Sequence, residues 1–404
     1  MVGMANQKRM ELRSSFPTGW VSITGISMPQ TRGFAATEGG DIFPFHPLHN
    51  HSAGIAVLPD KTLLVVFYRG TGERTADDVA IWASRRDRSG KWCEPVVIAD
   101  TPGFPDTNPV VTVAPNGDIH LYYGTQLDNN WESTLLKQRI GRIKGSSGCR
   151  IEWSRDQVVH LKTDEDAFRR QYLPRLKTVY AGATPVDIFP KYYAIQEERS
   201  QKRLNLRLGW MGRCTPIWVG SQLYLPLYHD GFDVGLVAMS SDGGTTFTAG
   251  GPIVGRAAVQ PSLLRLTDGS WMAYNRNNGP GPMRILAAKS VDGCKSWSLA
   301  TEMTLPNPGV SVAVDRHADG TIVLVGNDTE DGRHSLAYWC SRDEGKSWST
   351  ATTIEAAPAG SEWSFHYPNM VRLPNGNLAL VYSRYAKAGQ TIRYVELTQQ
   401  QIKA

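Results

Sequence analysis

The sequence predicts an all-β fold, a six-bladed β-propeller, from a repeated hairpin motif, a turn marker in the same phase, and many turn residues. The motif occurs as SSDGGTTF, SVDGCKSW and SRDEGKSW, which start at Ser240, Ser290 and Ser341, at intervals of 50 and 51 residues. A fixed period of this length is typical of blades that each hold four short strands. A degenerate copy, SRRDRSGKW, starts at Ser84, about three periods upstream of Ser240.

The second marker is a tight turn between two apolar runs. It occurs in LPDKTLLVVF, APNGDIHLYY, LTDGSWMAY, HADGTIVLV and LPNGNLALVY. Gly, Asn and Asp suit such turns, so each marker predicts strand, turn and strand. With the hairpin VGSQLYLPLY there are six repeats. A degenerate seventh blade is the alternative, because the interval from Asn116 to Ser221 is twice the usual spacing.

We expect one propeller domain over residues 20–400, preceded by an N-terminal extension at residues 1–19. Residues around 160–207 lack strand alternation, which predicts an insertion with a short helix. The segment WVSITGI, residues 20–26, is expected to pair with the last blade and close the ring, so that no sheet edge stays open.

Composition excludes several classes of function. The formal charge is +5, and no run of Lys and Arg is interleaved with aromatic residues, so no nucleic-acid partner is expected. No apolar run reaches about 18 residues, so no membrane association is expected either. The start of the chain lacks the apolar core of a signal peptide, which predicts a cytoplasmic protein as written, or a secreted or periplasmic one if a leader is missing. The five cysteines form no CxxC pair and are expected to be reduced and mostly buried, and no cofactor is expected.

The aspartate of each hairpin motif has a structural explanation. Asp242, Asp292 and Asp343 can each accept hydrogen bonds from their own turn, while the terminal Trp or Phe packs between sheets. We therefore do not expect these aspartates to be catalytic acids.

These Asp-box hairpins and their period resemble the sialidase (neuraminidase) superfamily, specifically its BNR-repeat branch, from about Asn50 to Leu397. The resemblance implies a propeller of sialidase type. It also implies three arginines that bind a substrate carboxylate, a tyrosine nucleophile paired with a glutamate, and an aspartate acid. By the same resemblance, WMAYNRNN supplies Arg276 as the second arginine, GRHSLAYWCSRDEG supplies Arg333 as the third, and HYPNMVRLPNG supplies Tyr367 as the nucleophile.

Three positions depart from the family pattern. In NHSAGIAVLPD, His51 replaces the first arginine, and near AVQPSLLRL the closest polar residue to the expected glutamate is Gln260. The acid position falls in GTGERTADDVAIW, where Glu73, Asp77 and Asp78 compete and spacing does not choose among them. We take Asp78 as the candidate acid.

Polar residues recur where the inner strands are expected to start and to converge on the propeller axis. They are His51, Asn108, Arg213, Gln260, Asn307 and Tyr367. Several precede a proline, which at the first residue of a strand needs no ladder N–H. Arg213 is expected near the rim of the site. We predict that substrate is bound by Arg276, Arg333, Arg213, Gln260, Asn108 and Asn307.

The predicted partner is an acidic oligosaccharide or glycoconjugate, because arginine forks bind carboxylates well. An imidazole has an ordinary pKa of about 6.5, which suits a general base near neutrality. If two arginines neutralise a uronate carboxylate, His51 would abstract the adjacent proton while Tyr367 protonates the departing oxygen, which is β-elimination. A structural role for His51 is the alternative. A metal site from His46, His49 and His51 fits no common zinc spacing, and no metal is expected.

Three functions remain open from the sequence. The first is an enzyme that cleaves a glycosidic bond at a uronate or sialic acid by His-assisted β-elimination, as in rhamnose-glucuronate lyases. The second is an exo-sialidase-like glycoside hydrolase with Tyr367 as nucleophile. The third is a non-catalytic glycan-binding propeller, favoured by the missing first arginine and glutamate.

Overall fold

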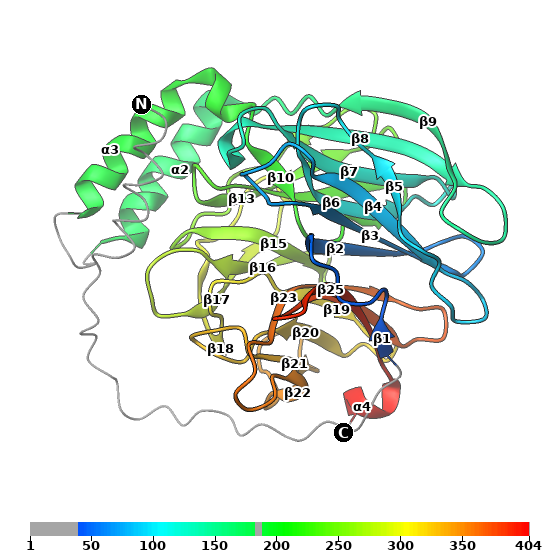
Figure 1. The fold of residues 1–404 in the computed structure, drawn as a ribbon. Coiled ribbons are helices and arrows are strands. Elements are labelled where there is room, and N and C mark those ends of the chain that lie inside the picture. Colours follow the sequence, from blue (N-terminus) through cyan, green and yellow to red (C-terminus); the bar gives the residue numbers. More distant parts are fainter. Residues whose placement is uncertain (1–38, 182–187, 404) are drawn as a thin grey trace. The chain divides into compact units, whose positions relative to one another are not determined.

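The computed structural model describes residues 39–181 and 188–403. Within these residues, 25 strands form six antiparallel sheets arranged as the blades of a propeller (Figure 1). The prediction of an all-β, six-bladed propeller is confirmed. The segment at residues 20–26, which was predicted to close the ring, lies outside the described residues, as does the N-terminal extension at residues 1–19.

The first blade contains β2 (His49–Val57), β3 (Leu63–Gly70), β4 (Ala80–Arg86) and β5 (Val96–Ala99). The second contains β6 (Asp106–Val113), β7 (Ile119–Gln126), β8 (Thr134–Ile143) and β9 (Ile151–Val158). The third contains β10 (Trp210–Gly212), β11 (Ile217–Val219), β12 (Gln222–His229), β13 (Val234–Ser240) and β14 (Thr248–Ala249). The fourth contains β15 (Ala258–Arg265), β16 (Trp271–Asn277), β17 (Arg284–Ser290) and β18 (Thr301–Pro306). The fifth contains β19 (Ala313–Arg316), β20 (Ile322–Gly326), β21 (Ser335–Ser341) and β22 (Thr352–Ala356). The sixth contains β23 (Ser364–Arg372), β24 (Leu378–Ala386), β25 (Gly389–Leu397) and β1 (Gly39–Asp41).

Both faces of a blade are buried against neighbouring blades, which explains why strand β3 is apolar without alternation. Leu64 and Val66 pack toward the second blade, in a cluster with Val111 and Leu121. The alternate residues of β3, such as Val65, pack toward the sixth blade. The hydrophobic core therefore lies between the blades, and each inner strand is held from both sides.

The N-terminal strand β1 closes the ring. Gly39, Gly40 and Asp41 pair antiparallel with the C-terminal strand β25, at the outer edge of the sixth blade (Figure 1). This pairing joins the two ends of the propeller chain in one sheet. The unpaired edge that β25 would otherwise expose is thereby covered.

The long interval after the second blade contains two helices, α2 (Glu165–Val179) and α3 (Ile188–Gln201), where the sequence predicted one short helix. Asp164 caps α2 by accepting a hydrogen bond from the backbone of Ala167, and Phe168 and Tyr172 bury its apolar side. The two helices lie side by side next to the third blade, so the described residues contain no seventh blade (Figure 1). The remaining helical segments are η1 (Trp131–Ser133), η2 (Arg203–Leu206) and α4 (Gln399–Lys403).

The three Asp boxes repeat one hydrogen-bond pattern, which confirms their structural role. In the fourth blade, the Asp292 carboxylate accepts from the Ser290 hydroxyl at 2.9 Å and from the Ser296 backbone N–H at 2.9 Å. The Ser290 hydroxyl in turn accepts from the Cys294 backbone N–H at 3.0 Å. Asp242 and Asp343 make the same bonds in their own turns. These carboxylates therefore stabilise the hairpin turns.

We predict that Asp292→Ala lowers the free energy of unfolding by about 1 kcal/mol, because the lost hydrogen bonds belong to an exposed turn. Urea denaturation of the variant and the unchanged chain measures the difference. Because the three boxes share one hydrogen-bond pattern, Asp343→Ala should also lower the free energy of unfolding. A loss of stability no larger than that of Asp331→Ala, an exposed loop control, would contradict the assignment.

Candidate functional site

Four inner strands carry a β-bulge near their starts. In β2, β6, β15 and β23 the pairing register shifts at residues of positive φ: Ser52 (58°), Asn108 (50°), Gln260 (55°) and Tyr367 (55°). A proline follows in the last three, inside the strand rather than at its first residue as predicted. A bulge leaves the proline nitrogen outside the ladder. Non-glycine residues of positive φ are strained, and such residues cluster at functional sites. These four positions are therefore candidates for a functional site.

Three side chains contact Tyr367: two arginines and one glutamine. Its hydroxyl oxygen accepts from the Arg276 guanidinium at 2.9 Å and from the Gln260 side-chain amide at 3.2 Å. The guanidinium of Arg213 lies 4.8 Å from the centre of its ring. Because Arg276 and Gln260 both donate, the phenolic proton of Tyr367 must point toward another acceptor.

Arg276 and Arg333 are both available for an anion. Within the described residues, no carboxylate oxygen lies within 4.0 Å of either guanidinium, and the buried Nε of Arg276 has no hydrogen-bond partner. Arg333 donates to His366 Nδ1 at 2.7 Å and to the Gly309 carbonyl at 3.0 Å. Burial, and then the positive charge of Arg276, lower the pKa of Arg333. Two like charges near each other favour binding of a carboxylate.

His51 lies against Tyr367, with ring centroids 4.2 Å apart and planes inclined by 32°. Its Nδ1 forms a 3.0 Å hydrogen bond with the Ser383 hydroxyl, and its Nε2 has no partner among the described residues. Burial is the main cause that lowers the pKa of His51 well below 6.5, and electrostatic interactions with the neighbouring histidines and arginines lower it further. His51 is therefore neutral near neutral pH and can accept a proton at a free nitrogen.

His366 was missed by the sequence analysis, although it precedes Tyr367 just as His51 precedes Ser52 at the bulge of β2. Because Arg333 can only donate, His366 Nδ1 must accept, and its Nε2 then donates to the Ser364 hydroxyl at 2.8 Å. Its ring stacks on Tyr385 at 4.2 Å. Burial and the charge of Arg333 lower the pKa of His366 well below 6.5. A neutral His366 thus holds Arg333 without cancelling its charge.

Glu73 is the carboxylate that contacts this group of rings. It accepts a hydrogen bond from the Tyr68 hydroxyl and lies 3.6 Å from His49 Nε2. Burial raises the pKa of Glu73, but hydrogen bonds from His49 and Tyr68 outweigh it and lower the pKa overall. The chosen candidate Asp78 instead accepts two 2.9 Å hydrogen bonds from Thr71 in its own loop.

Asp77, the third competitor for the acid position, accepts from the Asn129 side chain at 2.7 Å, across to the second blade. Of the three carboxylates, only Glu73 touches the rings around His51. Sequence spacing contained no signal for this choice, because the three lie in one loop between β3 and β4.

Arg213 lies at the axis, 1% exposed, and not at the rim where it was expected. It donates to the Ala53, Tyr367 and Pro368 carbonyls and to the Ser311 hydroxyl. These partners occupy the guanidinium, so it supports the strands that carry the site.

The two predicted asparagines are also bonded within the protein. Asn307 uses its amide on the Gly309 and Val310 backbone, in the loop before β19. Asn108 accepts from the Ser52 hydroxyl at 3.2 Å and donates to the Tyr228 hydroxyl at 3.3 Å. The structure thus brings His51, Tyr367, Arg276, Arg333 and Gln260 together, and gives Arg213, Asn108 and Asn307 internal contacts.

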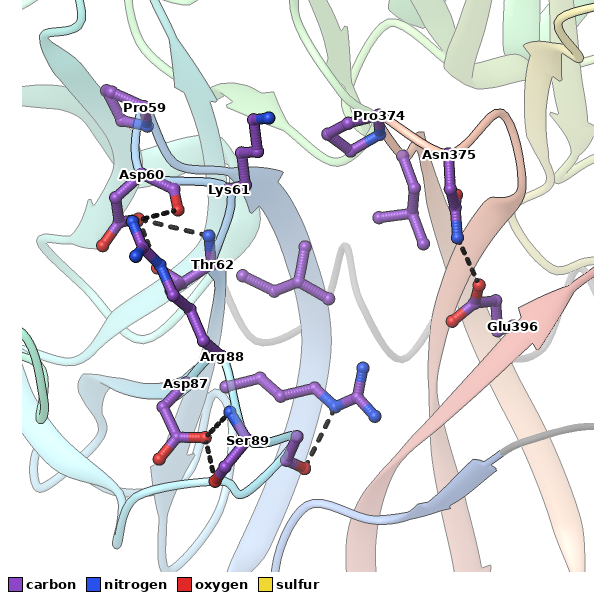
Figure 2. Close-up of a pocket in the computed structure, with 14 residues that line it drawn as sticks. Pro59, Asp60, Lys61, Thr62, Asp87, Arg88, Ser89, Pro374, Asn375 and Glu396 are labelled. Carbon is purple, nitrogen blue, oxygen red and sulfur yellow. Dashed lines mark hydrogen bonds between the residues drawn. The ribbon is translucent and has the colours of Figure 1, made fainter.

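A separate cavity of about 860 Å³ lies between the first and sixth blades (Figure 2). It is lined by the turn that follows β23, whereas Tyr367 lies near the start of that strand. Several of its polar side chains are bonded within the protein: Asp60 with Thr62 and Asp87 with Ser89 in their own turns, and Asn375 with Glu396 of β25 (Figure 2). Because none of the predicted site residues lines it, we do not take this cavity as the functional site.

Among the described residues, no group of three or more His, Cys, Asp or Glu is arranged to hold a metal ion. In the same part of the chain, no helix combines the length and apolar composition needed to cross a membrane.

Six antiparallel blades, Asp-box hairpins, and arginines beside a tyrosine on the last inner strand define a propeller of sialidase type. The family model described as a BNR repeat-like domain matches residues 61–174 and 198–380. The chain belongs to this family, in the BNR branch of the sialidase superfamily. No curated protein matches it by sequence.

Solved structures share the fold at low identity. A protein of unknown function from Dyadobacter fermentans has a TM-score of 0.64 at 14% identity, over 89% of this chain and 97% of that one. The Hadza microbial sialidase Hz136 has a TM-score of 0.64 at 14% identity, and the match covers 90% of this chain and 68% of that one. The leech intramolecular trans-sialidase has a TM-score of 0.63 at 12% identity, and the match covers 91% of this chain and 71% of that one. These similarities establish the fold alone.

We predict that the stability of the protein falls as the pH drops below about 6.5, because His51 and His366 stay neutral in the folded chain. The unfolded chain binds protons there that the folded chain does not, so the free energy of unfolding decreases by at most about 1.4 kcal/mol per histidine per pH unit. Urea denaturation at about pH 7.5 and about pH 5.5 measures this loss.

His366→Gln should make this pH dependence shallower, because glutamine can accept from Arg333 and does not titrate in this range. His160→Gln, at an exposed position, is the matched control and should leave it unchanged. Equal pH dependence in all three proteins would show that His366 does not contribute.

Proposed function

We propose that this protein is a carbohydrate-active enzyme that binds a uronate-containing glycan and cleaves the adjacent glycosidic bond by β-elimination. The observation that carries the proposal is the pair Arg276 and Arg333, which have no carboxylate partner among the described residues and flank Tyr367 and His51. A carboxylated sugar is the ligand that such a pair complements.

The first requirement of elimination is neutralisation of the uronate carboxylate. Arg276 has an unbonded buried Nε, and Arg333 is held by a neutral His366. Charge-assisted hydrogen bonds from both guanidiniums would draw electron density from the carboxylate and make the proton on the adjacent carbon more acidic. The arginines therefore serve both binding and activation.

The second requirement is a base that is neutral before reaction. His51 meets it, because burial keeps the imidazole deprotonated and Ser383 fixes the ring through Nδ1. The free Nε2 would take the proton from the sugar carbon. The ring of His51 would then carry a positive charge next to Tyr367.

The third requirement is an acid for the departing oxygen. Tyr367 receives hydrogen bonds from Arg276 and Gln260, so its own proton is free for another acceptor. After it gives that proton to the leaving oxygen, the same two donors stabilise the phenolate. Proton return from His51 to Tyr367, whose ring centroids are 4.2 Å apart, would restore both residues.

Hydrolysis with Tyr367 as nucleophile is the second candidate, supported by similarity in fold to proteins described as sialidases. That mechanism needs a carboxylate to take the tyrosine proton. Among the described residues, the Tyr367 hydroxyl contacts Arg276 and Gln260, whereas Glu73 is bonded to Tyr68. The contacts of Tyr367 therefore favour its use as an acid.

We predict that the protein releases an unsaturated uronate product, with rising ultraviolet absorbance, from glycans in which the uronate carries another sugar on its O4, because that sugar is the leaving group. His51→Ala should lower the rate by about 10²- to 10⁴-fold, the usual contribution of a general base, and Tyr367→Phe should lower it similarly. His160→Ala and Tyr224→Phe, remote from Tyr367, are the matched controls and should keep full activity.

Product masses separate the candidates, because hydrolysis adds one water that elimination does not. Release of sugar from a fluorogenic sialoside, without unsaturated product, would favour the hydrolase. Binding on a glycan array with no product by mass spectrometry would favour a binding propeller. Full activity of His51→Ala would overturn the role of His51.

We predict that Arg333→Met weakens uronate binding by about 10- to 100-fold, since each charged hydrogen bond contributes roughly 1.5–3 kcal/mol. Arg276→Lys should also weaken it, because lysine keeps the charge and loses the fork. Calorimetry with glucuronate oligosaccharides measures the affinity. Arg142→Met, which removes an exposed arginine paired with Asp118, should leave it unchanged. Equal affinities in all four proteins would contradict carboxylate binding at this pair.

A further inference from the structure

Two cysteines from different blades lie in contact, away from the proposed site. The sulfur atoms of Cys93 and Cys149 are 3.2 Å apart. Cys93 lies between β4 and β5 of the first blade, and Cys149 lies in the loop between β8 and β9 of the second. Both thiols are free in this structure, and Cys214, Cys294 and Cys340 contact no other thiol among the described residues.

Hydrogen bonds to Arg85 fix both segments that carry the two cysteines. The buried guanidinium of Arg85, in β4, donates to the Gly145 and Gly148 carbonyls at 3.1 Å and 3.4 Å, which fixes the loop that carries Cys149. The backbone of Arg85 also accepts from the Cys93 N–H at 2.9 Å. One residue thus positions both thiols, and their proximity does not depend on free movement of the loop.

The two thiols differ in access and in acidity. Cys93 is half-buried, whereas Cys149 is 5% exposed. The hydrogen bond from Cys149 lowers the pKa of Cys93 to about 6, against the effect of burial and with help from the Arg85 N–H. The same hydrogen bond and burial raise the pKa of Cys149. Since the thiolate is the nucleophile, Cys93 is suited to react first and Cys149 second.

We propose that Cys93 and Cys149 form a redox-active pair that closes into a disulfide between the first and second blades. The oxidant is a low-molecular-weight disulfide. The Cys93 thiolate attacks one sulfur of that disulfide, forming a mixed disulfide and releasing one thiolate. Cys149 then loses its proton and attacks the Cys93 sulfur, which forms the bond between the blades and releases the second thiolate.

The closed pair is two electrons more oxidised than the dithiol, and the small disulfide is reduced to two thiols. The new bond links residues 56 apart in sequence, so it restricts the unfolded chain and should stabilise the ring. The pair does not involve Tyr367 or the arginines, and its test is therefore independent of the proposed function.

The experiment incubates the full chain with oxidised glutathione near neutral pH, alkylates the remaining thiols in denaturant, and digests without reductant. We expect a cross-linked peptide pair containing Cys93 and Cys149, lighter by two hydrogen atoms than the sum of the reduced peptides. The thermal midpoint should rise by a few degrees and return on addition of dithiothreitol.

Variants separate the two roles. Cys149→Ser should accumulate glutathione on Cys93, because the second step is removed. Cys93→Ser should give neither the cross-link nor a glutathione adduct at buried Cys149, and Cys340→Ser, the control, should cross-link as the unchanged chain does. Absence of the cross-link in the unchanged chain, or an equal yield of adduct at Cys93 and Cys149, would overturn the proposal.

Discussion

A buried cation at the propeller axis holds the inner strands in place. Arg213, from the third blade, donates to backbone carbonyls of the first and sixth blades and to Ser311 before the fifth. Burial lowers the pKa of this guanidinium, yet it remains a cation and would be costly in the interior without these acceptors. Because it also lies against the Tyr367 ring, the same contacts orient the site residue and join the blades.

The fold could be predicted from the sequence because its signals are local and repeated. Each Asp box satisfies its own turn, as the bonds around Asp292 show, and the period between boxes fixes the blade length. The second α-helix was missed because α3 has only a weak apolar periodicity. The prolines were predicted at the first residues of strands, but they lie at bulges inside the strands. A bulge depends on pairing with the next strand, which one segment of sequence does not encode.

The candidate site was predicted in part. Arg276, Arg333 and Tyr367 came from family motifs, and the structure brings them together with His51. The choice among Glu73, Asp77 and Asp78 depended on how one loop folds, and only Glu73 turns toward Tyr68. His366 escaped notice because its role is to accept from Arg333, 33 residues earlier in the chain, a contact that exists only after two blades have packed.

Strand β1 pairs with β25, although more than three hundred residues separate them in the chain. Among the described strands, β1 is made first and its partner β25 is made last, so this pair forms late. Contacts of such long sequence separation form late because closing a long loop is entropically costly. Until β25 has been made, β1 has no partner and the ring of blades remains open.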